Sequence, residues 1–485
     1  MKLIELLNNI DYKLIKGTLD IDVKDIAYDS RKIEKDFAFV CLIGIDTDGH
    51  NYINQAIKNG ANCIITCKDV TVDDDVTIIR LEDTRTQLSY LSANLFNNPA
   101  DKLIKIGITG TKGKTSTSWM IKSILEANGE KVGVIGTIGT YINNVLYEHK
   151  NTTPESYYIQ KFMRQMVDEN VKYLIMEASS TALKVGRINN IIFDYAIFTN
   201  LSIDHVGPRE HPSYEDYVES KMKLFKQSKI AIINNDDKES SHIKDIASCE
   251  LYTYGENNTS DIKIENIEYL KEEGFLGTKF KLNGKIEGNY KVSAPGIFSA
   301  YNAASAIIVS NMLGVEDSVI KKGLEKFYVE GRCEIINVNN KINVIIDFAH
   351  NKISMKSIIE TMKSYPHNKI ISIFGCGGGR SYDRRYELGE VSAKLSDLSI
   401  VTTDNPRNDD INEIMCDIVQ GLKDNNGNYK IIEDRKEAIE YALANAEKDD
   451  IILILGKGHE KFQEIKGKIY PFDEKRIVKD FINRL

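Results

Sequence analysis

The chain has 485 residues, with 63 basic and 71 acidic side chains, and therefore a formal net charge of −8. Domains average roughly 100–200 residues, so this length predicts several domains with sizeable cores. The hydrophobic share of 42% and the charged share of 28% are typical of soluble globular proteins and argue against a disordered or fibrous chain. The acidic excess argues against a large nucleic-acid-binding face, because phosphate binding needs concentrated Lys and Arg.

The first residues, MKLIELLNNIDYKL, lack the basic flank and the long apolar core of a secretory signal. No run reaches the roughly 18 apolar residues of a membrane span. We therefore expect a cytoplasmic protein without membrane insertion. The seven cysteines form no paired metal knuckles, because Cys63 and Cys67 have no second pair at such spacing, and we interpret them as reduced thiols, mostly in the core.

Short apolar runs rich in β-branched residues alternate with helical patterns along the chain. In chain order they read NCIITC, KIGITG, KYLIMEAS, DYAIFTNLS, KIAIINND, NVIIDFAH, KIISIFG, LSIVTTD and DIILILG. Such runs, bounded by Gly, Asp or Asn, are typical of parallel strands that are buried on both faces. Their alternation with helices predicts an α/β fold.

Two breaks in this pattern predict domain boundaries. Asn97, Asn98 and Pro99 interrupt a helical pattern just before the strand KIGITG, and the glycine of VEGRCE precedes a new series of strands and helices. We therefore expect three domains, at residues 1–100, 101–329 and 330–485.

The strongest chemical signal is the segment KIGITGTKGKTSTSW, a strand that leads through a glycine-rich turn into a helix. Its spacing is Gly110-x-x-Gly113-Lys114-Thr115, two residues shorter between the glycines than the usual phosphate loop. Backbone N–H groups at such a turn bind phosphate oxygens, a lysine neutralises charge, and a threonine hydroxyl can ligate Mg²⁺.

Acidic residues and a histidine follow the next two predicted strands. Glu177 ends KYLIMEAS, while Asp204 and His205 follow DYAIFTNLS. Ligands of α/β proteins bind at the carboxyl edge of the sheet, where all three residues are expected, and an acidic residue such as Glu177 can hold Mg²⁺ there, beside the glycine-rich turn.

Taken together, the GTKGKT turn, Glu177, the NLSIDH segment and the later DFAH and GKGHE segments resemble the Mur ligase superfamily of ATP-dependent amide-bond synthetases, and within it the MurE type. The likeness covers essentially the whole chain. It implies an N-terminal domain for a uridine nucleotide, a central ATPase domain with a phosphate-loop parallel sheet, and a C-terminal Rossmann-like domain that receives an amino acid.

The resemblance implies residues for ATP and for metal. Those for ATP are Gly110, Thr111, Lys112, Gly113, Lys114, Thr115, Ser116, Asn302, Arg332, Asp347 and His350. Those for two Mg²⁺ ions are Thr115, Glu177, His205 and Lys221, the last as a carbamate (N6-carboxylysine) made with CO₂. Lys114, Glu177, His205 and Lys221 are the expected catalytic residues.

It also implies residues for the two other substrates. For the UDP-sugar these are Ser30, Thr152, Thr153, Ser179, Ser180 and Arg187. For the amino acid they are Arg380, Asp404, Asn405, Pro406, Arg407, Gly456 and Glu460. The DNPR tetrad looks like the form associated with meso-diaminopimelate, whose distal carboxylate the Arg407 guanidinium can bind with two hydrogen bonds.

The implied reaction adds a diamino acid to UDP-N-acetylmuramoyl-L-alanyl-D-glutamate through an acyl phosphate, in peptidoglycan synthesis, by a monomeric enzyme. Three segments depart from the family pattern, namely VGPREHPSYEDY, DFAHNKISM and GGGRSYDRR. Two alternatives therefore stay open: a MurE-like paralogue that uses another amino acid or acceptor, and a phosphate-loop protein that no longer catalyses.

Overall fold

The computed structural model describes residues 1–44, 47–72, 75–202, 207, 210–272, 275–338 and 342–484. The chain divides into two compact units, one of Met1–Lys263 with Ala304–Ile320 and one of Ile264–Ala303 with Lys321–Leu485. The three predicted domains, with boundaries near residues 100 and 329, stay a prediction. Among the described residues, no helix combines the length and the apolar character that crossing a membrane requires.

The N-terminal part of the first unit is a small sheet with short helices. The strands, in pairing order, are β1 (Lys13–Lys16), β5 (Thr77–Arg80), β4 (Ala61–Thr66), β3 (Phe37–Val40) and β2 (Ile26–Ala27). The helices are α1 (Leu3–Leu6), η1 (Ser30–Lys32), η2 (Gly49–Tyr52), α2 (Ile53–Lys58), α3 (Thr84–Leu95) and η3 (Pro99–Lys102). Strand β1 is antiparallel to β5 and the other pairs are parallel, so β2, β3 and β4 end at one edge.

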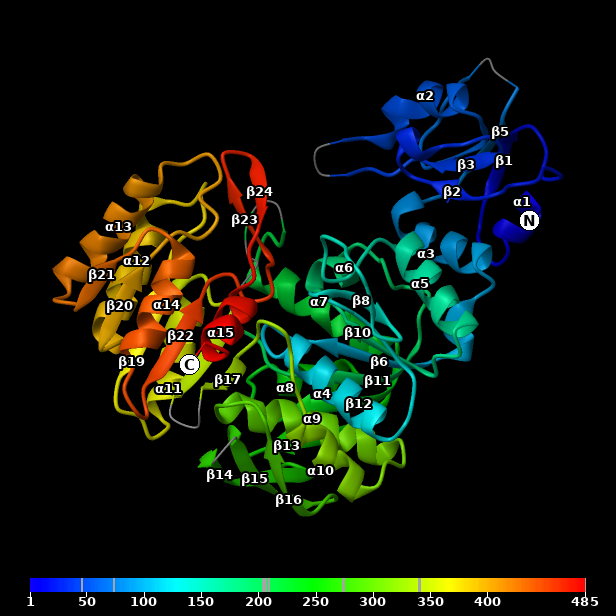
Figure 1. The fold of residues 1–485 in the computed structure, drawn as a ribbon. Coiled ribbons are helices and arrows are strands. Elements are labelled where there is room, and N and C mark those ends of the chain that lie inside the picture. The colour runs from blue at the N-terminus through cyan, green and yellow to red at the C-terminus, as the bar shows by residue number, and fades with distance from the viewer. Residues whose placement is uncertain are drawn as a thin grey trace. The chain divides into compact units, whose positions relative to one another are not determined.

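The rest of the first unit is built on a larger, mainly parallel sheet (Figure 1). Its strands, in pairing order, are β13 (Glu250–Gly255), β12 (Ser228–Asn234), β11 (Phe193–Phe198), β6 (Ile104–Thr109), β10 (Tyr173–Glu177), β7 (Val132–Gly136), β8 (Gly139–Ile142) and β9 (Val145–Tyr147). Its helices are α4 (Lys114–Ala127), α5 (Ser156–Asp168), α6 (Ser180–Lys184), α7 (Tyr214–Lys226) and α8 (Ser240–Ile246). Strand β6 lies between β11 and β10, parallel to both.

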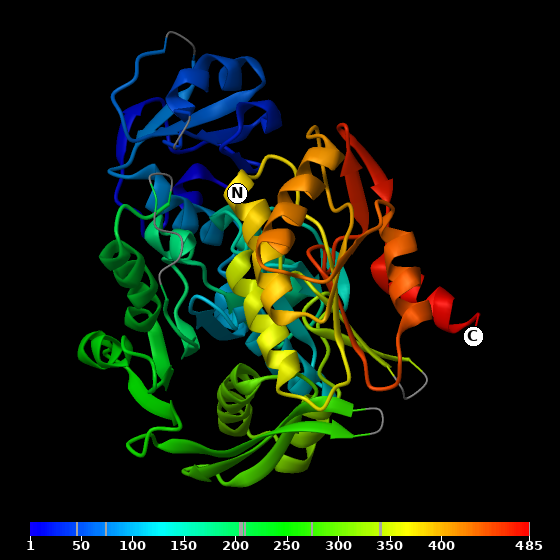
Figure 2. The same ribbon diagram turned by 90° about the vertical axis from the view of Figure 1, so that its left-hand side faces the viewer.

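The second unit contains a sheet with helices on both faces (Figure 2). Its strands, in pairing order, are β17 (Glu334–Val338), β18 (Ile342–Asp347), β22 (Ile451–Leu455), β19 (Ile370–Phe374), β20 (Leu398–Val401) and β21 (Tyr429–Ile431). Helices α11 (Lys352–Lys363), α12 (Tyr382–Leu395) and α13 (Ile411–Asp424) pack on one face. Helices α14 (Arg435–Asn445) and α15 (Glu474–Ile482) pack on the other.

The remaining elements are three strands, of which the first begins parallel to β13 and the last two are antiparallel to each other, together with an antiparallel hairpin and two helices. The strands are β14 (Ile262–Glu272), β15 (Phe275–Gly284), β16 (Gly288–Val292) and a hairpin of β23 (Phe462–Ile465) and β24 (Lys468–Pro471). The helices are α9 (Ile297–Met312) and α10 (Asp317–Glu325).

The α/β prediction is confirmed, because each of the nine apolar runs forms a strand with parallel neighbours. The strands outside these nine runs were not predicted. Strand β14 shows why, since exposed and half-buried polar residues fill most of its length and leave no apolar run to detect.

A buried ion pair joins helix α15 to helix α14, and its arginine also contacts strand β22 of the second unit. Nε of Arg435 lies 2.6 Å from Oε1 of Glu474, and both side chains are almost fully buried. Arg435 Nη2 also donates to the carbonyl oxygen of Leu455 at 2.8 Å. Burial raises the pKa of Glu474, and the Arg435 cation opposes that shift.

We expect Arg435→Ala to lower the free energy of unfolding by about 3–5 kcal/mol, because it leaves the Glu474 carboxylate buried without its cation. Arg484→Ala is the matched control: its pair with Glu440 has an arginine side chain that is 60% exposed and should contribute at most about 1 kcal/mol. Urea unfolding followed by circular dichroism measures both. Equal losses of unfolding free energy in the two variants would show that the buried ion pair contributes no more to stability than the exposed one.

Candidate active site

The glycine-rich turn predicted to bind phosphates lies between β6 and α4. Gly110 follows the strand with φ +151°, and Gly113 precedes the helix with φ +87°. A Cβ added at Gly110 would lie 2.0 Å from Oγ1 of Thr199, so a larger residue does not fit there. The turn leads directly into the N-terminus of a 14-residue helix, where backbone N–H groups and the helix dipole favour an anion.

Thr199 and Asn200, which directly follow strand β11, form hydrogen bonds with this turn. The sequence did not single them out as site residues. The carbonyl oxygen of Asn200 accepts from Thr111 N–H at 2.8 Å, and its Oδ1 accepts from Lys112 N–H at 3.0 Å. Thr199 Oγ1 donates to the carbonyl of Lys112 at 2.7 Å. Their position directly after a predicted parallel strand was the available signal, because such residues meet at one sheet edge.

Two lysines share one backbone acceptor in this turn. The ammonium groups of Lys114 and Lys221 each lie 2.8 Å from the carbonyl oxygen of Gly110. Lys114 also donates to the carbonyl of Thr111 at 3.0 Å. Lys221, on α7, is 2% exposed and its ammonium lies 4.7 Å from the centre of the Tyr217 ring. The two positive charges on one oxygen, one buried on Lys221 and one half-buried on Lys114, repel each other, and an anion beside them would relieve that repulsion.

Glu177 ends β10 beside the turn and is fully buried. Its Oε2 accepts from the hydroxyl of Thr115 at 3.0 Å and from that of Thr137 at 2.8 Å. A third hydroxyl oxygen, Oγ1 of Thr152, lies 3.2 Å from Oγ1 of Thr137. A carboxylate with neighbouring hydroxyl oxygens is a donor set that suits Mg²⁺, so Thr115 and Glu177 fit the predicted metal site. His205 and Asp204 lie outside the described residues.

Predicted residues of the UDP-sugar site gather behind Glu177. Thr153 donates its hydroxyl to the carbonyl of Glu177 at 2.7 Å and accepts from the Ser179 N–H at 3.0 Å. Arg187 Nη1 donates to the carbonyl of Thr153 at 2.8 Å, and Nη2 pairs with Glu155 at 2.8 Å. Burial lowers the pKa of Arg187, and the Glu155 carboxylate counteracts that shift.

Ser180 belongs to the same group through a buried histidine. Its hydroxyl lies 2.9 Å from Nε2 of His211, whose Nδ1 lies 2.6 Å from a carboxylate oxygen of Asp216. Lys184 also pairs with that carboxylate at 2.8 Å. The structure therefore brings Thr152, Thr153, Ser179, Ser180 and Arg187 together around the end of β10.

The remaining predicted UDP-sugar residue, Ser30, lies apart from this group, in η1 of the N-terminal sheet. A pocket with about 550 Å³ of empty space opens beside it. Its lining comes from the N-terminal sheet and from α5, and comprises Ile26, Ala27, Tyr28, Asp29, Lys32, Phe37, Tyr157, Tyr158 and Lys161. Helix α5 follows the Thr152–Thr153–Pro154 segment, so the same stretch of chain reaches both places.

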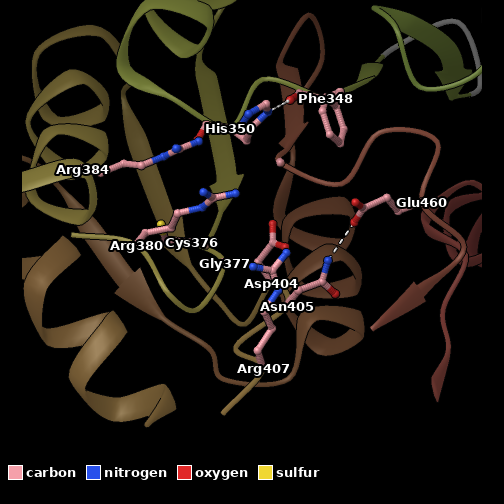
Figure 3. A pocket seen from close by; sticks show the side chains of 12 residues that line it. Phe348, His350, Cys376, Gly377, Arg380, Arg384, Asp404, Asn405, Arg407 and Glu460 are labelled. Carbon is pink, nitrogen blue, oxygen red and sulfur yellow. Dashed lines mark hydrogen bonds between the residues drawn. The ribbon is translucent and has the colours of Figure 1, made fainter. Parts of the chain in front are cut away.

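The second unit contains a pocket at the carboxyl edge of its sheet (Figure 3). It has about 490 Å³ of empty space and is lined by Phe348, His350, Gly375, Cys376, Gly377, Arg380, Arg384, Asp404, Asn405, Arg407, Gly456 and Glu460. Six of the seven residues predicted for the amino acid are in this lining. The seventh, Pro406, lies between two of them in the chain.

Asn405 and Glu460, which line the pocket, form a hydrogen-bonded group with the buried Lys457. Asn405 Nδ2 donates to Oε2 of Glu460 at 2.8 Å (Figure 3). The ammonium of Lys457 is fully buried and donates to Asn405 Oδ1 at 3.0 Å and to the same Glu460 oxygen at 3.3 Å. Sequence reasoning missed Lys457, although it lies inside the GKGHE segment.

Backbone geometry places the other pocket residues. Gly456 has φ +116°, and a Cβ there would lie 2.4 Å from Oδ2 of Asp404. Arg407 has φ +54°, which is uncommon for a residue with a side chain. Its N–H donates to the carbonyl of Glu464 at 2.9 Å, and its Nη1 lies 3.3 Å from the carbonyl oxygen of Gly378.

Arg380 and Arg384 enter the pocket from the side opposite Glu460 (Figure 3). Arg384, which was not predicted, donates to the carbonyl of His350 at 3.0 Å, while its Nε is buried with no hydrogen-bond partner among the described atoms. Burial lowers the pKa of His350, and the nearby Arg384 cation lowers it further. His350, predicted to face ATP, thus lines the same pocket as the amino-acid residues.

The other residues predicted for ATP are Asp347, Arg332 and Asn302. Asp347 is half-buried and accepts from the N–H groups of Cys333 at 2.7 Å and Ala349 at 2.8 Å. Burial raises its pKa, and the Arg332 cation counteracts that shift. The Arg332 guanidinium lies 5.0 Å from the centre of the Phe348 ring. Asn302 is buried on α9.

Comparison with known proteins agrees with this arrangement. The chain matches the Mur ligase family catalytic domain over residues 22–95, the Mur ligase middle domain over 108–310 and the Mur ligase glutamate ligase domain over 331–458. It is 40% identical over 489 residues to a Clostridium acetobutylicum protein named UDP-N-acetylmuramoyl-L-alanyl-D-glutamate–2,6-diaminopimelate ligase 1, with all of both chains covered.

Two solved structures extend the likeness to the fold. One, titled as a UDP-N-acetylmuramoyl-L-alanyl-D-glutamate–2,6-diaminopimelate ligase, matches with a TM-score of 0.75 and 27% identity, covering 100% of this chain and 99% of that one. The other, MurF ligase from Thermotoga maritima in complex with ADP, has a TM-score of 0.60 and 18% identity and covers 95% of this chain and 97% of that one. With three matching domains and a full-length relative at 40% identity, the chain belongs to the Mur ligase family.

Proposed function

We propose that this protein is the ATP-dependent ligase that joins meso-diaminopimelate to UDP-N-acetylmuramoyl-L-alanyl-D-glutamate in peptidoglycan synthesis. The observation that carries the proposal is the pocket of the second unit. Arg380, Asp404, Asn405, Arg407, Gly456 and Glu460, from three separate chain segments, line it together. Guanidinium and carboxylate groups at opposite sides suit an amino acid that carries both carboxylate and ammonium groups.

In the proposed reaction, the carboxylate of the D-glutamyl residue attacks the γ-phosphate of ATP, giving an acyl phosphate and ADP. Attack by one anion on another depends on neutralisation of charge, which Lys114 provides within the glycine-rich turn. Thr115 and Glu177 would hold Mg²⁺, which supplies further neutralisation of the phosphate oxygens when bound. An amine of the diamino acid then attacks the acyl carbon and expels phosphate, so no covalent bond to the enzyme is needed.

Several polar residues at the pocket of the second unit have a proposed role toward the amino acid. Arg380 and Arg407 bind carboxylates, and Glu460 binds an ammonium group. Asn405 and the buried Lys457 fix the Glu460 carboxylate through its Oε2 atom. The Arg407 backbone, tied to Glu464, fixes the position from which its guanidinium reaches the distal carboxylate. The cytoplasmic location and the monomeric state expected from the sequence stay predictions.

The proposed function is tested with purified protein, ATP, Mg²⁺, the UDP-muramoyl dipeptide and an equimolar mixture of meso-diaminopimelate, L-lysine and L-ornithine. We expect mass spectrometry to find the diaminopimelyl tripeptide as the main product, and Lys114→Ala to lower its rate of formation at least about 10²–10³-fold. A different main product would identify the paralogue alternative. ATP turnover with no amide product from any amine would contradict the proposal.

We also propose that Lys221 is a carbamate in the active enzyme, because that modification replaces one of the two cations on the Gly110 carbonyl with an anion. We expect Lys221→Ala to lower kcat at least about 100-fold and a small carboxylate such as acetate to restore part of it. Lys223→Ala, on the exposed side of the same helix, is the control and should keep full activity. Full activity of Lys221→Ala without acetate would remove the carbamate from the mechanism.

Arg407 is the proposed selectivity residue. The Arg407 guanidinium is proposed to bind the distal carboxylate of meso-diaminopimelate, which L-lysine lacks. Arg407→Ala should therefore lower kcat/KM for meso-diaminopimelate about 10–100-fold and leave kcat/KM for L-lysine nearly unchanged. Arg476→Ala, with a side chain that is 79% exposed, is the matched arginine control. Steady-state kinetics with both amines measures the effect, and an equal loss with both would exclude a role in selectivity.

A further inference from the structure

A cysteine, a histidine and a carboxylate form a hydrogen-bonded chain in the N-terminal sheet, away from the residues assigned above. Cys67 follows β4 directly, and its Sγ lies 3.8 Å from Nε2 of His50. The other ring nitrogen, Nδ1, lies 2.5 Å from Oδ1 of Asp48. When Nδ1 carries the proton and donates it to this carboxylate, the lone pair of Nε2 faces the thiol, which is the arrangement that activates a nucleophile.

The surroundings of the Cys67–His50–Asp48 group favour transfer of the thiol proton from Cys67 to His50. The His50 side chain is 8% exposed, so its ring is held in place, whereas Cys67 is half-buried and can be reached by a small reagent. Hydrogen bonds from Lys68 and from the His50 backbone N–H lower the pKa of Asp48. Asp48 is therefore an anion at neutral pH and stabilises the imidazolium that forms when His50 takes the proton.

The other cysteines of this sheet differ from Cys67. Cys41 and Cys63 are buried, and burial raises the pKa of Cys41 to about 12 and also raises that of Cys63. Both stay protonated at neutral pH and are shielded from solvent. Cys416, on α13, is exposed, and no histidine contacts its thiol in the described part of the chain. Cys416 is thus an internal reference: a thiol that solvent and reagents reach but that no histidine activates.

We propose that Cys67 is a reactive thiol that forms mixed disulfides with low-molecular-weight disulfides. His50 takes the thiol proton, the Cys67 thiolate attacks one sulfur of the disulfide, and the disulfide's own S–S bond breaks. The leaving thiolate then takes the proton from His50. Cys67 is oxidised, the leaving thiol is reduced, and no further reagent is needed.

The position of Cys67 links such an adduct to the pocket beside Ser30. Strands β4, β3 and β2 are neighbours and parallel, so Cys67 and the Tyr28–Asp29 pair emerge at the same sheet edge. Two strand spacings separate them, which is about 10 Å. An adduct of tripeptide size spans that distance. If this pocket binds the uridine nucleotide, as the proposed function requires, the adduct lowers the affinity for UDP.

Reaction of the full-length protein with oxidised glutathione at pH 7 tests the proposal. Peptide mass spectrometry over time gives a separate rate of adduct formation for each cysteine. We expect Cys67 to react at least about 10-fold faster than Cys416, although Cys416 is more exposed. This comparison uses the unchanged protein and does not depend on any variant folding. A rate for Cys67 equal to or below that of Cys416 would overturn the proposal.

The role of the imidazole is tested with His50→Gln, which removes the base. We expect the Cys67 rate to fall about 10-fold while the Cys416 rate stays the same. The buried Cys41 and Cys63 should stay unreactive in a folded variant, so they report whether the N-terminal sheet is intact. His242→Gln, at a half-buried histidine on α8, is the matched control and should leave both rates unchanged. An unchanged Cys67 rate in a folded His50→Gln protein would show that the histidine does not activate the thiol.

Calorimetric titration with UDP tests the consequence. We expect the adducted protein to bind UDP at least about 5-fold more weakly than the unmodified protein, and reduction with dithiothreitol to restore binding. Equal affinities would overturn the link between Cys67 and the pocket. Absence of UDP binding to the unmodified protein would instead contradict the proposed function and leave the measured reactivity of Cys67 in place.

Discussion

The parallel pairing of β6 with β10 on one side and β11 on the other is the constraint on which the candidate active site depends. In this register Ile108 lies opposite Glu177, and Thr109 lies opposite Phe198. The three strands therefore end level with one another. Because they do, the glycine-rich turn, the Glu177 carboxylate and the Thr199–Asn200 pair meet at one edge although almost 90 residues separate the first from the last.

The candidate sites of the two units carry different sets of charged side chains. The difference matches the ligand that each site is proposed to bind. Beside the glycine-rich turn, two lysine ammonium groups share a single carbonyl oxygen, so the local charge favours a polyanion. In the pocket of the second unit, arginines face Asp404 and Glu460. A zwitterionic amino acid suits that mixture better than a phosphate does, because each of its charges meets an opposite one.

Much of the fold and of the candidate site was predictable from the sequence because both depend on short-range signals. Continuous apolar runs identify strands buried on both faces, and the Gly110-to-Thr115 spacing identifies the glycine-rich turn between β6 and α4. Strand β14 carries no such run. The hydrogen bonds of Asn200 to the turn and the positive φ of Arg407 were not predictable, because both arise only when distant segments pack together.

The same limit applies to the roles of residues within the pocket of the second unit. Sequence resemblance assigns Glu460 to the amino acid, but the structure shows that its Oε2 atom is already bound by Asn405 and by a fully buried Lys457. A buried ammonium is costly without an anionic partner, so Glu460 also stabilises the pocket itself. Its other oxygen, Oε1, does not take part in these two contacts and can face a substrate ammonium. Loss of Glu460 therefore acts on folding as well as on binding, and the two effects separate only when stability and affinity are measured on the same variant.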